Sequence, residues 1–313
     1  MRTRRTESSS NPASSRGHAS VLLHEVVAVL DVQPSDTVLD ATLGGAGHAR
    51  SLAEMLGKEG TFIGIDADGA ALKRAEEALS GIDSKIQLIK GNFRNMRSLL
   101  LERSISRVDK ILFDLGWSAY TLTSGRGFSF QGNEPLLMTY EDSVDEEALT
   151  AKLILNTWGE ENIADVLYGF GGERFSRRIA RAIVEHREKS SFETTQDLVS
   201  VVEKAVPAMY RTRKIHPATK TFQALRIAVN DELEALAEAL VASIDLLNGG
   251  GRVAVLTFHS TEDRLVKRAF KDFEQRGFGQ VIEKIKPTTE ETTQNPRARS
   301  ALLRTFEKTE TKS

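Results

Sequence analysis

Residues 37–47 read TVLDATLGGAG, and residues 62–68 read FIGIDAD. In each stretch a short apolar run ends in an acidic residue, Asp40 or Asp66, and glycines follow the first acid. Glycine lets the backbone turn sharply and approach a ligand closely, and an acid after the next strand accepts hydrogen bonds from ribose hydroxyls. This order of strand, glycine turn, helix, strand and acid is typical of a doubly wound α/β sheet that binds a ribose-bearing cofactor.

Three cofactor classes compete for the glycine loop. Dinucleotide-binding sites typically carry the motif G-x-G-x-x-G. Counting from Gly45, the position of the third glycine holds Arg50. Loops that bind nucleoside triphosphates carry the motif G-x-x-x-x-G-K-[ST], which does not occur in the sequence. S-adenosylmethionine needs no pyrophosphate cradle, so the looser loop suits it best. The alternative without a ligand is an ordinary turn between strand and helix.

Composition narrows the class of protein. The chain has 313 residues, 40% of them hydrophobic, which is enough for one large or two modest domains with real cores. The absence of cysteine excludes disulfides and thiolate metal sites, and six scattered histidines predict no metal centre. No apolar run approaches the ~20 residues that cross a bilayer, so we expect a cytoplasmic protein without membrane contact.

Basic residues gather in three segments although the formal net charge is −2. Any one segment is readily explained as a solvated helix face, but three together favour a polyanionic substrate. The segments contain Arg174, Arg177, Arg178, Arg181, Arg187 and Lys189; Arg211, Arg213, Lys214, Lys220 and Arg226; and Arg264, Lys267, Arg268 and Lys271.

Periodicity predicts the domain organisation. Residues 1–17 form a Ser- and Arg-rich tail that we expect to be disordered, and residues 18–117 form the first part of the sheet domain, with strands near 37–42, 61–66, 86–91 and 108–115. Residues 118–213 read as an inserted helical domain that binds substrate. The sheet domain resumes over 214–313, with one long helix whose apolar face runs from Leu225 to Leu247 and with strands near 252–258, 278–285 and 301–308.

Long motifs add a resemblance to this pattern. HASVLLHEVV, DATLGGAGHA, FIGIDAD, GNFRNM, FDLGWS, SGRGFSF, HPATKTFQALRIAVNDELEAL, LTFHSTEDRLVK and NPRARSALLR follow in that order. Together they resemble the bacterial 16S rRNA (cytosine-N4)-methyltransferase family from His18 to about Phe306. The resemblance implies a Rossmann-like, S-adenosylmethionine-dependent enzyme that methylates a decoding-region cytosine. The small ribosomal subunit would be its partner, and the resemblance allows a homodimer.

The resemblance also implies a cofactor site. It places the methionine end of the cofactor at Ala46, Gly47 and His48, the ribose acid at Asp66, and the adenine side at Phe93 and Asp114. Gly45 of the glycine loop and Thr121 are further candidate cofactor contacts. The family pattern usually has glycine at the position of Ala46 and glutamine at that of Thr121. It also has an acid and an arginine where Leu137 and Thr139 stand, so we expect the substrate contacts here to differ from the family pattern.

Asp114 is the candidate catalytic residue. The fourth strand ends in Asp114-Leu115-Gly116-Trp117, where DNA amine methyltransferases carry an Asp/Asn/Ser-Pro-Pro-aromatic motif. A carboxylate there can accept a hydrogen bond from the poorly nucleophilic cytosine amine and stabilise the charge that develops on nitrogen. Cofactor contact is the alternative role for Asp114, and burial is the alternative for Trp117 as a base-stacking residue.

The remaining candidates are substrate contacts. They are mostly cations or hydrogen-bonding groups near the predicted sheet edge or in the inserted domain: Trp117, Arg126, Arg177, Arg181, His216, Lys220, His259, Ser260, Arg264, Arg297 and Arg299. For His259 the alternative is a structural loop histidine. Two rival functions stay open, namely a DNA amine methyltransferase and a non-catalytic RNA-binding or ribosome-assembly protein.

Overall fold

Seven strands form one sheet in the order β3-β2-β1-β4-β5-β7-β6. The computed structural model describes residues 20–116, 119–141, 144, 148–212 and 214–310, so the predicted tail and Trp117 lie outside the described residues. Strands β1 (Thr37–Asp40), β2 (Thr61–Asp66), β3 (Lys85–Lys90), β4 (Val108–Asp114) and β5 (Leu247–Thr257) are parallel to one another. Strand β7 (Leu302–Lys308) runs antiparallel between β5 and β6 (Gly279–Ile285). The predicted α/β sheet is confirmed, although β5 begins five residues before the predicted Arg252.

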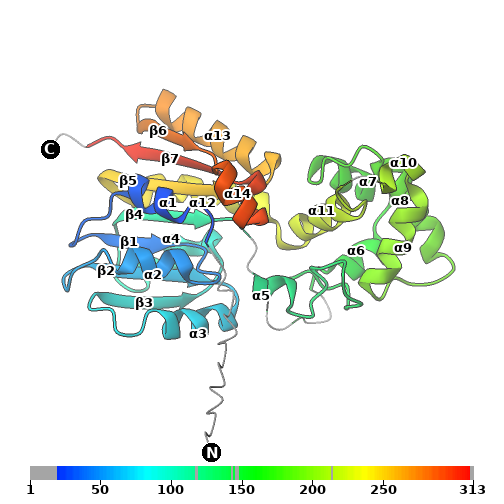
Figure 1. Ribbon diagram of the computed structural model, residues 1–313, viewed down its shortest axis with the longest axis horizontal. Coiled ribbons are helices and arrows are strands. Elements are labelled where there is room, and N and C mark those ends of the chain that lie inside the picture. The colour runs from blue at the N-terminus through cyan, green and yellow to red at the C-terminus, as the bar shows by residue number, and fades with distance from the viewer. Residues whose placement is uncertain (1–19, 117–118, 142–143, 145–147, 213, 311–313) are drawn as a thin grey trace, which may run out of the picture.

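Helices cover both faces of the sheet (Figure 1). Successive strand residues point to opposite faces, so Phe62 packs under α1 (Leu23–Leu30), α2 (Gly47–Ala53) and α3 (Gly69–Ala78). Its neighbour Ile63 packs with α4 (Met96–Leu101), α12 (Glu232–Leu246) and α13 (Ser260–Gln275). The chain also has four short helical elements: η1 (Phe93–Asn95), α5 (Ala119–Leu122), α14 (Thr289–Gln294) and η2 (Pro296–Ser300).

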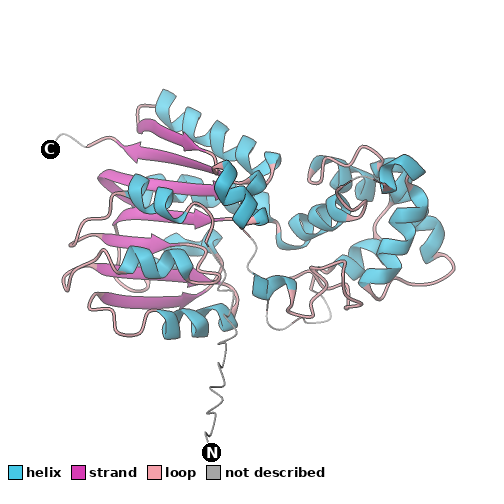
Figure 2. Cartoon of the chain, viewed as in Figure 1, coloured by secondary structure: helices cyan, strands magenta, loops and turns pink. Residues whose placement is uncertain are grey.

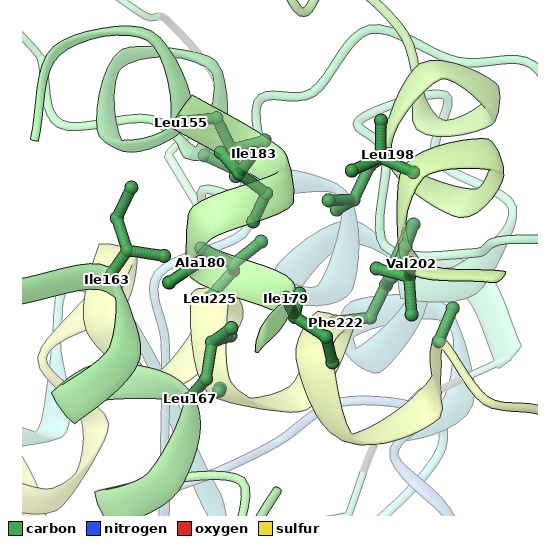
Figure 3. Packing of buried hydrophobic residues seen from close by; sticks show 14 of the residues in the cluster. Leu155, Ile163, Leu167, Ile179, Ala180, Ile183, Leu198, Val202, Phe222 and Leu225 are labelled. Carbon is green, nitrogen blue, oxygen red and sulfur yellow. The ribbon is translucent and has the colours of Figure 1, made fainter. Parts of the chain in front are cut away.

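A separate helical lobe stands beside the carboxyl ends of the parallel strands (Figure 2). It contains α6 (Ala151–Thr157), α7 (Glu160–Gly169), α8 (Ser176–Arg187), α9 (Thr195–Ala205), α10 (Ala208–Arg211) and α11 (Thr219–Asn230). Figure 3 shows its own apolar core, in which Leu167, Ile179, Ile183, Leu198 and Phe222 point toward one another. The sheet and this lobe therefore have separate cores.

The predicted long helix from Leu225 to Leu247 is wrong. The helix is interrupted at Asp231, whose φ of 47° is left-handed. This residue is the C-cap of α11 and the N-cap of α12. Leu225 packs in the helical lobe, whereas Leu236 packs against the sheet. The helical lobe therefore extends to Asp231, beyond the predicted boundary at 213. Apolar spacing did not reveal the break because each helix keeps its own buried stripe.

Within the residues described, no helix combines the length and apolarity needed to cross a membrane. The same part of the chain contains no cluster of three or more His, Asp or Glu side chains arranged to hold a metal ion.

Candidate active site

Two cavities meet at the carboxyl edge of the sheet, beside the helical lobe. The larger, of about 600 Å³, is walled by the loop after β1 and by aromatic residues of the helical lobe, among them Phe128, Phe130 and Phe222. The smaller, of about 140 Å³, is lined by residues that follow β2, β3 and β4. Asp114 lines both cavities. Its carboxylate therefore lies where a molecule bound in one cavity would contact a molecule bound in the other.

The predicted cofactor residues divide between these cavities. Ala46, Gly47 and His48, predicted at the methionine end, line the larger cavity together with Gly45. Asp66 and Phe93, predicted at the ribose and the adenine, line the smaller one, as does Thr121, which stands in place of the family's glutamine. The structure thus brings every predicted cofactor residue to the walls of these two adjoining cavities.

Asp66 is held by the backbone at the end of β2. Its Oδ2 accepts the N–H of Gly44 at 2.8 Å, and its Oδ1 accepts the N–H of Asp68 at 2.8 Å. Burial raises the pKa of Asp66, and these two N–H groups partly offset that rise. Each carboxylate oxygen accepts more than one hydrogen bond. A ribose diol therefore fits the acceptor capacity that remains on the cavity side.

The loop after β1 forms a tight wall. Gly44 has a φ of +51°, and a Cβ on Gly47 would stand 2.1 Å from Oγ of Ser20, so a side chain there would have to displace Ser20. Ala46, the departure from the family pattern, has a φ of 60° and a buried methyl group. Glycine is favoured in this left-handed conformation because it lacks a Cβ, which gives the usual glycine a physical reason.

His48 and Asp114 form a buried pair behind this wall. Nδ1 of His48 lies 3.2 Å from Oδ2 of Asp114, and Nε2 lies 3.0 Å from the carbonyl oxygen of Val21. Both ring nitrogens face acceptors, an arrangement that the doubly protonated imidazolium satisfies. Burial would lower the pKa of His48, but the hydrogen bond and charge of Asp114, with the charge of Asp40, raise it overall.

The same pair keeps Asp114 ionised. Burial would raise the pKa of Asp114, but the His48 hydrogen bond and charge, the N–H of Gly116 and the charge of Arg297 lower it overall. Oδ1 accepts the Gly116 N–H at 3.0 Å, and the backbone N–H of Asp114 donates to Oγ1 of Thr42 at 2.5 Å. The side chain is 25% exposed. Asp114 is therefore a fixed anionic acceptor that faces the site.

A second buried pair joins the two lobes. Arg226 of α11 is 2% exposed, and its Nη2 lies 2.7 Å from Oε2 of Glu232 in α12. The hydroxyl of Tyr140 donates to Oε1 of Glu232 at 3.0 Å. Arg226 lines the larger cavity, and Glu232 and Tyr140 line the smaller. The sequence reasoning missed Glu232 and Tyr140, because neither residue follows a strand or belongs to a recognised cofactor motif.

With this geometry established, comparison with known proteins assigns the family. The model of the MraW methylase family matches residues 15–309. The chain belongs to this family. It is a methyltransferase, and S-adenosylmethionine is its cofactor, as the resemblance predicted.

Individual relatives cover almost the whole chain. The ribosomal RNA small subunit methyltransferase H of Brevibacillus brevis is 43% identical over 310 residues, or 93% of this chain and 98% of that protein. The protein of the same name from Dictyoglomus thermophilum is 43% identical over 295 residues, or 94% and 97%. Among solved structures, an rRNA methylase from Streptococcus thermophilus aligns with a TM-score of 0.44 at 13% identity and covers 92% of this chain and 94% of that one.

Some predicted substrate residues of this methyltransferase lie at the cavities. His259 lines the larger cavity and also caps α13, because its Nδ1 accepts the N–H of Glu262 at 3.4 Å. The structural alternative for His259 is thus present beside the functional one. Arg297 lines the larger cavity. Arg126 lies in the smaller cavity and donates to the carbonyl of Tyr140 at 3.0 Å, on the cofactor side.

Others lie outside the cavities or support the fold. The His216 ring stacks on Phe130 with centroids 4.6 Å apart, so it supports the larger cavity from behind. Lys220 donates to the carbonyl of Gly172 at 2.8 Å. Ser260, Arg264 and Arg299 are exposed. Arg177 and Arg181 are exposed on α8, which lies at the end of the helical lobe away from the sheet (Figure 1).

Proposed function

We propose that this methyltransferase methylates N4 of a cytosine in the decoding region of 16S rRNA. One observation carries the proposal: Asp114 lines both the cofactor-side cavity and the larger cavity. The names of the curated relatives, which specify small-subunit ribosomal RNA, support the class of substrate. The small ribosomal subunit as partner and the cytoplasm as location are parts of the same proposal.

The residues of the smaller cavity would hold the nucleoside part of the cofactor. Asp66 binds the ribose hydroxyls, and Phe93, whose ring meets Phe113 edge to face at 5.9 Å, presents an apolar surface to the adenine. The loop from Gly45 to His48 encloses the methionine end. When bound, S-adenosylmethionine supplies an electrophilic methyl group on its sulfonium.

The chain's own contribution to the reaction is positioning and charge. A cytosine amine is a weak nucleophile because its lone pair is delocalised into the ring. Asp114 accepts a hydrogen bond from the amine and stabilises the positive charge that develops on nitrogen. His48 keeps Asp114 ionised and fixed in orientation. Phe128, Phe130 and Phe222 give the larger cavity an apolar wall against which an extruded base packs, which helps to hold the amine ~3–3.5 Å from the methyl group.

The two rival functions make different predictions. A DNA amine methyltransferase would modify duplex DNA, and a non-catalytic assembly protein would not bind S-adenosylmethionine. The paired N–H donors on Asp66 and the buried His48–Asp114 pair argue against loss of the cofactor site.

Mass spectrometry of nuclease-digested substrates tests the proposal. Small subunits and free 16S rRNA from cells that lack this gene product, together with duplex DNA, are incubated with the parent protein or with Asp114→Asn. We expect N4-methylcytidine at one rRNA position, formed by the parent and strongly reduced in the variant. The proposal would be refuted if the parent methylated duplex DNA, or if it left the rRNA unmodified both in small subunits and as free 16S rRNA. Sedimentation of the purified protein tests whether it forms the homodimer that the resemblance allows.

A further inference from the structure

Between residues 264 and 271, α13 carries four cations on one face and no anion. Arg264, Lys267, Arg268 and Lys271 are all exposed, and their spacing of 3, 4 and 7 residues from Arg264 places them on one side of the helix. We call these four residues the α13 cationic stripe. At 1.5 Å per residue the stripe is about 10 Å long.

The acids of α13 do not neutralise this stripe. Each acid is engaged by another group: Glu262 accepts the N–H of Phe258 at 2.8 Å, Asp263 forms a two-point pair with Arg304 at 2.7 and 3.2 Å, Asp272 lies 3.4 Å from Arg276, and Glu274 accepts the N–H of Val281 at 3.0 Å. Within the described part of the chain, no side chain forms a salt bridge with the four cations.

Helix α13, which carries the stripe, begins at the active site. His259, the N-cap of α13, and Phe258 before it line the larger cavity. The hydroxyl of Thr261, in the first turn, lies 3.5 Å from the carbonyl oxygen of Phe170 in the helical lobe. From there α13 runs away from the helical lobe (Figure 1). A polymer that places one residue in the cavity can therefore leave the site along this helix.

The arginines of α8 contrast with the stripe. Arg181 lies 3.6 Å from the carboxylate of Glu160, and the guanidinium of Arg174, just before α8, stacks over Phe175 and Tyr210 at 4.7 and 5.1 Å. These cations are partly engaged, and α8 lies on the outer end of the lobe.

We propose that the α13 cationic stripe binds the phosphate backbone of the single RNA strand that flanks the target base. This inference rests on the proposed function, because it takes rRNA as the substrate. Uncompensated, exposed cations attract phosphates and release their counterions, which makes binding depend steeply on salt. Lysine and arginine on flexible stems give positioning without base specificity.

The test compares two triple variants with the same loss of charge. The first is Lys267→Gln/Arg268→Gln/Lys271→Gln in the stripe. The matched control is Lys58→Gln/Lys85→Gln/Arg103→Gln, which removes two lysines and one arginine that are exposed near the amino ends of β2, β3 and β4. Binding to unmethylated 16S rRNA and to purified small subunits is measured over a range of salt concentrations, and S-adenosylmethionine affinity by calorimetry.

We expect the stripe variant to flatten the slope of log K against log salt for free rRNA by ~0.7 per lost contact, or about 2 in all. The control should keep the slope of the parent, and all three proteins should bind the cofactor equally. If the parent binds and methylates rRNA but the stripe variant and the control have equal slopes, this inference is overturned while the proposed function stands. Weakened binding to subunits with an unchanged slope on free rRNA would also overturn it, and would assign the stripe to a ribosomal protein. A parent that neither binds nor methylates rRNA would overturn the proposed function and this inference with it.

Discussion

Replacing His48 by glutamine isolates the charge that the structure places behind Asp114. A glutamine amide reaches the position of Nε2 and keeps a donor for the carbonyl of Val21, which accepts from His48 at 3.0 Å. It supplies neither the Nδ1–H that faces Asp114 at 3.2 Å nor a positive charge. The variant therefore removes one charge-assisted hydrogen bond from a site where His48 is 5% exposed and Asp114 is 25% exposed.

The expected loss follows from that geometry. Hydrogen bonds to charged groups contribute ~1.5–3 kcal/mol, and the partial exposure of Asp114 favours the middle of this range. We expect the free energy of unfolding near pH 6 to fall by about 2 kcal/mol. Orientation of Asp114 is lost as well, so turnover should fall while cofactor binding weakens less.

The loss should depend on pH in a defined direction. The raised pKa of His48 means that its stabilisation is complete below its ordinary value of 6.5 and is lost as pH rises through the folded-state pKa. The lowered pKa of Asp114 means that its stabilisation is complete above 3.8 and is lost as pH falls through the folded-state pKa. The charge of Asp40 helps to raise the pKa of His48, and the charge of Arg297 helps to lower the pKa of Asp114. The charge of Asp66 in turn raises the pKa of Asp40. The difference between parent and variant should therefore be largest between about pH 4 and 6.5 and shrink as pH rises through the folded-state pKa of His48.

Urea denaturation of both proteins from pH 5 to 9 measures this difference. His48→Asn is the matched variant, since its amide nitrogen replaces Nδ1 and keeps a neutral donor for Asp114 while the Val21 contact is lost. We expect the asparagine variant to retain more turnover than the glutamine variant. A difference from the parent below 0.5 kcal/mol, or one that does not change with pH, would refute the imidazolium–carboxylate pair.

Three further predictions concern the carboxylates at the ends of the strands. Asp114→Asn should lower single-turnover rates at saturating cofactor and RNA by ~10²–10³; a rate within threefold of the parent would leave Asp114 as a cofactor ligand only. Asp66→Ala should weaken S-adenosylmethionine binding roughly 5- to 150-fold, because an unpaired buried ribose diol costs ~1–3 kcal/mol; unchanged affinity in calorimetry would remove the ribose assignment. Burial raises the pKa of Asp40 from 3.8 to about 7, so the folded parent holds this proton more tightly than the unfolded chain and loses stability as pH rises between these values. Asp40→Asn should therefore be more stable than the parent at pH 8, by up to ~4 kcal/mol, and parallel pH profiles in denaturation would contradict this.

Sequence predicted those parts of the site that local pattern determines. The glycine loop, Asp66 and Asp114 each follow directly from a short apolar strand, so their positions at the sheet edge come from the order of elements alone. The parallel half-sheet follows for the same reason. The structure places the predicted cofactor residues in the two cavities, and their roles remain predictions.

The parts that sequence did not reveal depend on contacts between distant elements. His48 meets Asp114 only because β1 and β4 are neighbours. Arg226 meets Glu232 only because Asp231 takes a left-handed conformation that apolar spacing does not record. Lys220 looks like a phosphate ligand in a basic segment, yet its ammonium is bonded to a backbone carbonyl. Such side-chain contacts cannot be predicted from local sequence, because each joins residues that only the tertiary fold brings together.

The separate core of the helical lobe has a consequence for the order of folding. Strand β4 pairs with β5 in register, Asp114 opposite Leu256, although about 140 residues separate them along the chain. The entropy of closing an unstructured loop grows with its length, so early collapse of the lobe shortens the flexible connection and lowers that cost. During synthesis the first four strands emerge before β5 exists, and β4 then has a bare edge open to wrong pairing with other chains. Because translation adds ~5–20 residues per second, synthesis of the residues between β4 and β5 sets the shortest time for which a nascent chain carries this aggregation-prone edge.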